Sequence, residues 1–205
     1  MTANAPDSTP TALTIRFVDA VSYATLLHLD QARKGSGVPY VGHLLGVCSL
    51  VLEEGGSEDE AIAALLHDAG EDQGGEARLA DIRKRYGPYV ESIVRACSDT
   101  LLEDKPDWQK RKEGYLTHLE HQPRPVLLVS LADKLFNARA MLRDYLSIRE
   151  RLWDRFTGDR DDQLWYYRSL SDVFNRRLSD ARMTGELAEV VSELERACDA
   201  TASPR

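Results

Sequence analysis

The stretch Ala63-Ala64-Leu65-Leu66-His67-Asp68-Ala69-Gly70-Glu71-Asp72 places polar, metal-binding side chain types directly after an apolar run. Residues four apart share a face of a helix. A helix running through this stretch would therefore pair His67 with Glu71, and Asp68 with Asp72. Imidazole suits transition metals, and carboxylates suit harder cations as well. The stretch predicts that a helix carries part of a metal site.

Two further polar residues interrupt apolar segments and can complete such a site. His43 follows Pro39-Tyr40-Val41-Gly42, and Asp133 lies in Ser130-Leu131-Ala132-Asp133-Lys134-Leu135-Phe136-Asn137-Ala138-Arg139. A His-Asp pair on its own is usually a hydrogen-bonded or solvated pair at a helix end. Burying His43, Asp68 and Asp133 without partners would cost several kcal/mol, whereas one metal ion would satisfy them all. The predicted ligands are His43, His67, Asp68 and Asp133.

These segments resemble the hydrolase domain of the alarmone synthetase-hydrolases and, more closely, the stand-alone small alarmone hydrolases, which are HD-domain metal-dependent phosphohydrolases. The resemblance covers roughly residues 13–177. It implies hydrolysis of the 3′-diphosphate of ppGpp and pppGpp, giving GDP or GTP and pyrophosphate, with Mn²⁺ as the cofactor. The donor types alone leave manganese, iron and zinc open. The matching segments are RKGxGxPYxxH from Arg33, AALLHDxxED from Ala63 and LADKLxNxR from Leu131.

Glu71 and Asp72 are the candidate catalytic residues. A carboxylate one helical turn past the ligands can orient or deprotonate an attacking water, or protonate the leaving oxygen. The alternative is an exposed acidic helix end. The neighbouring ligands, and the Glu-Asp pair at the matching place of the family, favour catalysis.

Arg33 and Lys34 lie at the end of a helix predicted over residues 13–34, before the helix-breaking segment Gly35-Ser36-Gly37-Val38-Pro39. Basic residues at a helix C-terminus are often only partners of the helix dipole. The resemblance implies instead that both residues bind the nucleotide. The loop can bring Arg33 back over the metal.

Three more residues are candidates for substrate binding. Asn137 is one turn beyond Asp133 and is expected to face the same cavity, whereas Arg139 should point elsewhere. Tyr166 and Tyr167 belong to an aromatic cluster for which a core role is favoured. The family has an aromatic segment near this place, so either tyrosine could reach a phosphate.

Composition bounds the class of protein. The chain has 205 residues, of which 42% are apolar, and a formal net charge of −8. This length suggests one domain, predicted over residues 13–198, with a disordered segment 1–12 and a frayed segment 199–205. An acidic chain is a poor partner for nucleic acid or acidic membranes, and no apolar run reaches membrane-spanning length. Three widely spaced cysteines and the lack of a signal-peptide pattern predict a cytoplasmic protein with reduced thiols.

The expected architecture is all-α: a single HD-domain bundle of about eight to ten helices around a core metal site. Ser57 with Glu60 reads as a capping box that starts the helix carrying the HD pair. Asp162 is predicted to cap a long helix that ends at Arg182. Further helices are expected over residues 39–54, 79–86, 89–97, 108–121, 126–142, 147–156 and 186–198, with a loop over 98–107.

Alternative functions remain open at this point. The substrate could be an adenosine alarmone or another phosphorylated nucleotide, because the sequence does not place the hydrogen bonds that would recognise guanine. The chain could also be the antitoxin of a toxic alarmone synthetase, or a sensor that binds without turnover. Besides a nucleotide, a second copy of the chain and a cognate synthetase are the candidate partners.

Overall fold

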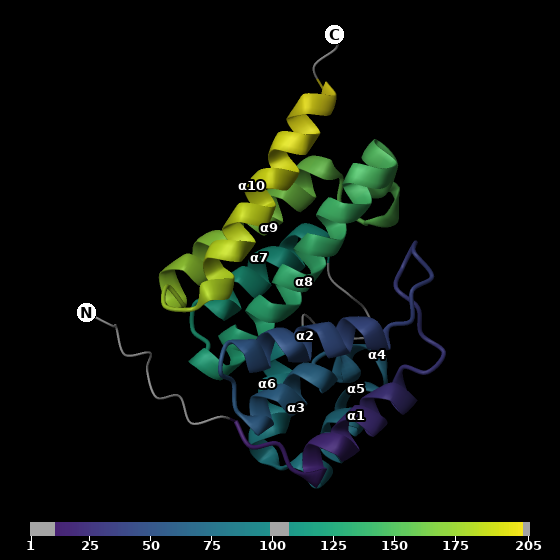
Figure 1. The fold of residues 1–205 in the computed structure, drawn as a ribbon, viewed down its shortest axis with the longest axis vertical. Coiled ribbons are helices and arrows are strands. Elements are labelled where there is room, and N and C mark those ends of the chain that lie inside the picture. The colour runs from purple at the N-terminus through teal and green to yellow at the C-terminus, as the bar shows by residue number, and fades with distance from the viewer. Residues whose placement is uncertain (1–10, 99–106, 203–205) are drawn as a thin grey trace, which may run out of the picture.

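The computed structural model describes residues 11–98 and 107–202, and within these ranges its regular secondary structure is helical apart from one isolated β-bridge between Ala32 and Pro39. The prediction of an all-α fold is confirmed (Figure 1). Most of the predicted terminal segments, and all of the predicted loop at 98–107 except its two end residues, lie outside the described residues. The elements are α1 (Ile15–Leu27), α2 (Val41–Glu53), α3 (Glu58–Leu66), α4 (Ala69–Asp72), α5 (Gly75–Tyr86), α6 (Pro88–Cys97), α7 (Trp108–Leu119), α8 (Arg124–Ile148), η1 (Arg149–Arg155, a 3₁₀ helix), α9 (Arg160–Arg177) and α10 (Arg182–Ala202).

Helix α8 is the helix on which the two halves of the molecule pack. It contacts α2, α3 and α6 on one side, and α9, α10 and η1 on the other (Figure 1). Pro125 lies in its first turn, where the missing backbone donor carries little penalty. Every residue from Val126 to Asp133 is buried, so this part of the helix has no solvent-facing side. Asp133 therefore lies in the core because its helix does.

Two capping boxes begin helices, and one differs from the prediction. The Ser57 hydroxyl accepts a bond from the Glu60 amide, and the Glu60 carboxylate accepts one from the Ser57 amide, which confirms the predicted start of α3. In α9 the cap is Asp159, and Asp162 is its partner three residues on. The prediction that Asp162 is the cap was wrong, because a carboxylate serves equally well at either end of a capping box. A turn after Leu178 also separates α9 from α10.

The segment between α1 and α2 folds back on itself. Helix α1 ends at Leu27, earlier than predicted, and α2 begins at Val41, two residues after Pro39. The Arg33 amide donates to the Val38 carbonyl at 2.8 Å, and the Tyr40 amide donates to the Gln31 carbonyl at 2.9 Å. Gly35 and Gly37 have φ of +75° and +70°, the left-handed region that favours glycine. The reversal brings Gln31 and Arg33 beside the start of α2.

Close packing of α2 on α8 depends on Gly46. A Cβ atom at this position would lie 2.0 Å from Cε2 of Phe136, whose ring is in edge contact with the His43 ring. We expect Gly46→Ala to lower the free energy of unfolding by about 1–3 kcal/mol, the usual cost of overpacking a core. Urea denaturation followed by circular dichroism measures this change. Gly42→Ala, in the same helix with open space around its Cβ position, should leave stability unchanged or slightly higher, and equal stability of both variants would contradict this packing argument.

Candidate active site

The sequence predicted one continuous helix through His67 and Asp72. The structure breaks this helix at His67 and Asp68, two of the predicted metal ligands. Helix α3 ends at Leu66, α4 begins at Ala69, and His67 and Asp68 form the junction. Neighbouring residues in an unbroken helix point in different directions. At this junction the two side chains meet, with His67 Nε2 2.9 Å from Asp68 Oδ2. Two consecutive residues at this junction therefore contribute to one site.

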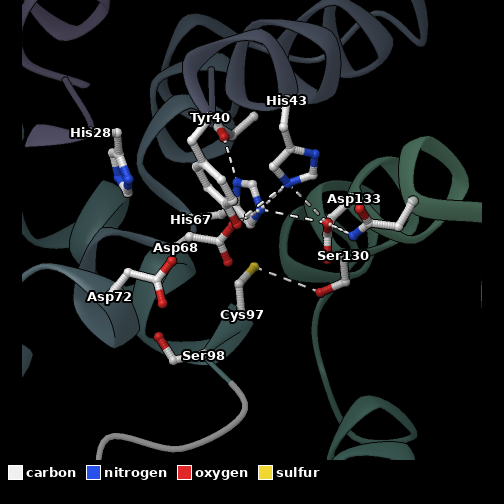
Figure 2. Close-up of polar contacts among 12 residues, drawn as sticks. His28, Tyr40, His43, His67, Asp68, Asp72, Cys97, Ser98, Ser130 and Asp133 are labelled. Carbon is white, nitrogen blue, oxygen red and sulfur yellow. Dashed lines mark hydrogen bonds and ion pairs between the residues drawn. The ribbon is translucent and has the colours of Figure 1, made fainter. Parts of the chain in front are cut away.

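The four predicted ligands converge on one point in the core (Figure 2). His43 of α2 and His67 face each other with their Nε2 atoms 3.3 Å apart. Oδ1 of Asp133, from α8, lies 3.3 Å from the His43 nitrogen and 3.6 Å from the His67 nitrogen. Oδ2 of Asp68 lies 3.5 Å from the His43 nitrogen. His43, His67 and Asp133 are all buried and offer ligand atoms within 4.8 Å of one another.

The electrostatics of this cluster favour a cation. Burial opposes a charge on His67, yet the carboxylates of Asp68 and Asp133 hold its pKa well above the ordinary value. His67 Nδ1 lies 2.8 Å from the Ala64 carbonyl oxygen, and only a protonated Nδ1 can donate to it. In a neutral imidazole the lone pair is then on Nε2, which faces the cluster. Two imidazole nitrogens and two carboxylates are a donor set that fits a divalent transition metal.

A second layer of polar side chains fixes the carboxylates. The Tyr40 hydroxyl donates to Asp68 Oδ2 at 2.6 Å, and burial followed by the Asp68 charge raises the pKa of Tyr40 strongly, so Tyr40 remains a donor. Lys134 Nζ donates to Asp133 Oδ2, and Asn137 Nδ2 donates to Asp133 Oδ1, both at 2.6 Å. Partners of this kind orient metal ligands. Tyr40 was not singled out from the sequence, although its position three residues before His43 places both on one side of a helix start.

A cavity of about 550 Å³ opens at the His43 and Lys134 side of the cluster. This volume lies within the usual range of small-molecule sites. Its aromatic lining residues are Tyr40, Trp108, Phe136, Phe156, Tyr166 and Tyr167. Its lining is strongly basic although the chain is acidic, with Asp144 as the acidic residue among the described lining residues. The basic residues are Arg33, Lys34, Arg111, Lys112, Lys134, Arg143 and Arg155.

The structure places all five predicted substrate-binding residues on this cavity: Arg33, Lys34, Asn137, Tyr166 and Tyr167. Arg33 Nη2 donates to Asn137 Oδ1 at 2.7 Å, which links the loop to Asp133 through Asn137. Tyr166 and Tyr167 are both buried and both line the cavity, so the core role and the cavity role coincide. Burial raises the pKa of Tyr167 to about 12. Arg139 points away, as predicted, and pairs with Glu186 of α10.

The candidate catalytic carboxylates lie in the short helix α4, one turn after the ligands. Glu71 is half-buried and Asp72 is exposed. The Asp72 amide donates to the Asp68 carbonyl at 2.9 Å, which closes the turn and keeps the two acidic residues next to the cluster. Figure 2 shows Asp72 beside Asp68, on the side away from Asp133.

The structure thus places two buried histidines and the buried Asp133, with the half-buried Asp68 beside them, in a donor set that fits a metal ion. The family model described as "HD domain" matches residues 20–153, and the chain belongs to this family.

Among curated proteins, the chain is similar to guanosine-3′,5′-bis(diphosphate) 3′-pyrophosphohydrolase MESH1 from Drosophila melanogaster. The two are 32% identical over 178 residues, which are 85% of this chain and 92% of the fly protein. The protein of the same name from Xenopus tropicalis is 36% identical over 129 residues, which are 62% of this chain and 69% of the frog protein. A solved structure titled as a metazoan ortholog of SpoT that hydrolyses ppGpp has the same fold. Its TM-score is 0.72 at 24% identity, covering 92% of this chain and 99% of that one.

Proposed function

We propose that this chain is a metal-dependent hydrolase that removes the 3′-diphosphate of ppGpp and pppGpp and releases pyrophosphate. The observation that carries the proposal is a basic, aromatic-lined cavity that opens on a buried His/Asp cluster. To bind a polyphosphorylated nucleotide, a site needs positively charged groups for the phosphates and an apolar surface for the base. The pyrophosphohydrolases to which the chain is similar are named for the guanosine substrate.

Different residues of the chain have different roles in the proposed reaction. The candidate ligands His43, His67, Asp68 and Asp133 would hold a divalent metal, which lowers the pKa of a coordinated water and polarises a phosphoryl oxygen. Glu71 and Asp72, one turn away, orient the attacking water and accept its proton. Lys134 and Arg33 bring positive charge to the side of the cluster where the diphosphate would lie.

A panel of substrates tests whether the nucleobase of the substrate is guanine or adenine. Purified protein is incubated with Mn²⁺ and with ppGpp, pppGpp and the adenosine counterparts in parallel, and the released pyrophosphate is measured. We expect turnover of the guanosine alarmones. Absence of pyrophosphate from ppGpp at micromolar enzyme would overturn the proposal, and preference for the adenosine compounds would reassign the substrate to the alternative class.

Arg33 is expected to act mainly in substrate binding. It lines the cavity, bonds Asn137 and lies over the Phe136 ring at 5.6 Å from its centroid. A guanidinium that holds phosphate or stacks on the base does so in both ground and transition states. Arg33→Ala should therefore raise KM more than it lowers kcat in steady-state kinetics. Arg139→Ala, which removes an arginine paired with Glu186 outside the cavity, should leave KM unchanged, and an equal rise in both variants would contradict the assignment.

Manganese is the metal we propose, on the family resemblance and the mixed nitrogen and oxygen donors. Reconstitution of metal-free protein with manganese, iron or zinc, followed by elemental analysis and pyrophosphate release, tests this choice. No helix in the described part of the chain is both long and apolar enough to cross a bilayer. The cytoplasmic location, a homo-oligomer, a cognate synthetase and an antitoxin role stay predictions from the sequence.

A further inference from the structure

Three side chains outside the metal cluster converge behind Asp72. Gln31 Nε2 donates to Asp72 Oδ2 at 2.8 Å. Oε1 of the same amide receives Gln73 Nε2 at 2.7 Å and His28 Nδ1 at 2.7 Å. An amide has acceptor capacity on its oxygen and donor capacity on its nitrogen. Since two donors meet the oxygen of Gln31, its NH₂ group is left facing Asp72.

His28 is placed in this network at some cost to stability. It is 2% exposed, and its Nε2 has no hydrogen-bond partner among the described residues. A buried polar atom without a partner is unfavourable, so an apolar ring would serve a purely structural role better. Its ring stacks on Tyr40, with centroids 5.3 Å apart and planes 20° apart. His28 therefore contacts both Gln31, which holds Asp72, and Tyr40, which holds Asp68.

We propose that Gln31, oriented by His28 and Gln73, is a positioning residue that holds the Asp72 carboxylate ready to accept a proton. The inference rests on the proposed function, in which Asp72 acts on the attacking water. The Gln31 N–H group donates to one oxygen of the carboxylate and so fixes the direction of that oxygen. The other oxygen is left for water near the metal cluster.

The charges around Asp72 support this role. Asp72 is exposed as a residue, but protein atoms displace water from its carboxyl group and raise its pKa, and the Asp68 and Glu71 carboxylates raise it further. The hydrogen bond from Gln31 and the nearby His28 ring lower the pKa of Asp72. The role rests on the geometry, since the Gln31 hydrogen bond at 2.8 Å fixes the direction of the carboxylate.

The surface position of the hydrogen bond between Gln31 and Asp72 distinguishes a positioning role from a structural one. Gln31, Asp72 and Gln73 line a second hollow of about 410 Å³ on the surface formed by the end of α1 and by α4. Water can replace the Gln31 amide at this surface, so the folded state depends little on the bond. The orientation of the carboxylate depends on it, because water imposes no fixed direction.

Gln31→Met tests the proposal, since it keeps the length of the side chain and removes both polar atoms. With Mn²⁺ and ppGpp, kcat should fall roughly 10–100-fold, as is typical for partners behind a metal-site group, with KM and bound metal close to those of the wild type. The melting temperature should fall modestly, because the buried His28 Nδ1 loses its acceptor. Asp30→Asn, an exposed neighbour on the same hollow, is the matched control and should match the wild type. A wild-type kcat in Gln31→Met, with the wild type active, would overturn the inference and leave the proposed function intact.

A double-mutant cycle tests the link to His28. His28→Phe keeps a ring stacked on Tyr40 and removes the donor to Gln31, so it should lower kcat by roughly three- to tenfold on its own, less than a full loss of the partner. In the Gln31→Met background the same change should have no further effect, because both act through one amide. Independent, multiplying effects, or a parallel loss of bound metal, would show that His28 acts structurally. If the wild type itself releases no pyrophosphate from ppGpp, the inference falls together with the proposed function.

Discussion

Asp133→Ala is expected to remove the bound metal and to lower pyrophosphate release from ppGpp by at least about 10³-fold. Loss of an ion that stabilises the transition state by several kcal/mol corresponds to such a factor. Asp133 faces both histidines on the central helix α8 and is more buried than Asp68, the other carboxylate of the cluster. The change should also destabilise the fold by about 3–5 kcal/mol, the cost of removing one partner of a buried pair, because Lys134 Nζ loses its carboxylate.

Asp133→Asn separates the two effects. The amide keeps the size of the side chain and an oxygen for Lys134, so stability should fall less while metal is still lost. Elemental analysis, thermal denaturation and kinetics are measured on the same samples. Asp144→Asn is the matched control, since Asp144 lies in the same cavity but pairs with Arg155. One metal ion per chain retained in Asp133→Ala would contradict the ligand assignment.

Glu71→Gln is expected to lower kcat by about 10²–10⁴-fold, the usual contribution of a general acid or base. Glu71 is outside the candidate ligand set, so bound metal should stay near the wild-type level. KM should change little, because a group that acts mainly in the transition state contributes to kcat.

The control for Glu71→Gln is Glu76→Gln, the same chemical change at the first turn of α5. Glu76 pairs with Arg95 at an exposed site, and such pairs contribute little, so this variant should turn over ppGpp at the wild-type rate. Steady-state kinetics and elemental analysis on both variants decide the matter. Turnover of Glu71→Gln at the wild-type rate would require the acid–base role of this residue to be abandoned.

The fold class was predictable because the relevant signals are local. Apolar periodicity, the Ser57 capping box and the Gly-rich breaks act over a few residues and mark helices directly. Boundaries were less accurate where two local signals compete. Arg33 was predicted at the end of α1, but the chain leaves the helix after Leu27 because the loop is stabilised by pairing with the start of α2.

The candidate ligands were predictable for a different reason. Buried imidazole and carboxylate groups within apolar segments need a common partner, so their positions stand out in the sequence. Tyr40 and Gln31 did not stand out, because a tyrosine or a glutamine near a predicted helix end has no such requirement. Their roles depend on the reversal of the 28–40 segment, which brings residues between α1 and α2 beside Asp68 and α4. The basic lining of the cavity was equally hidden, since its residues come from separate elements.

The arrangement of the cluster around α8 also bears on how the protein folds. Its members come from α2, from the junction of α3 and α4, and from α8, and the two histidines alone are 24 residues apart. No short segment can form the site by itself, so high affinity for an ion exists only once distant parts of the chain have docked. Binding to the native state alone raises stability by mass action. An ion held here would thus act as a non-covalent cross-link between α2, the junction of α3 and α4, and α8. Its uptake during refolding would report that these elements have reached their native arrangement.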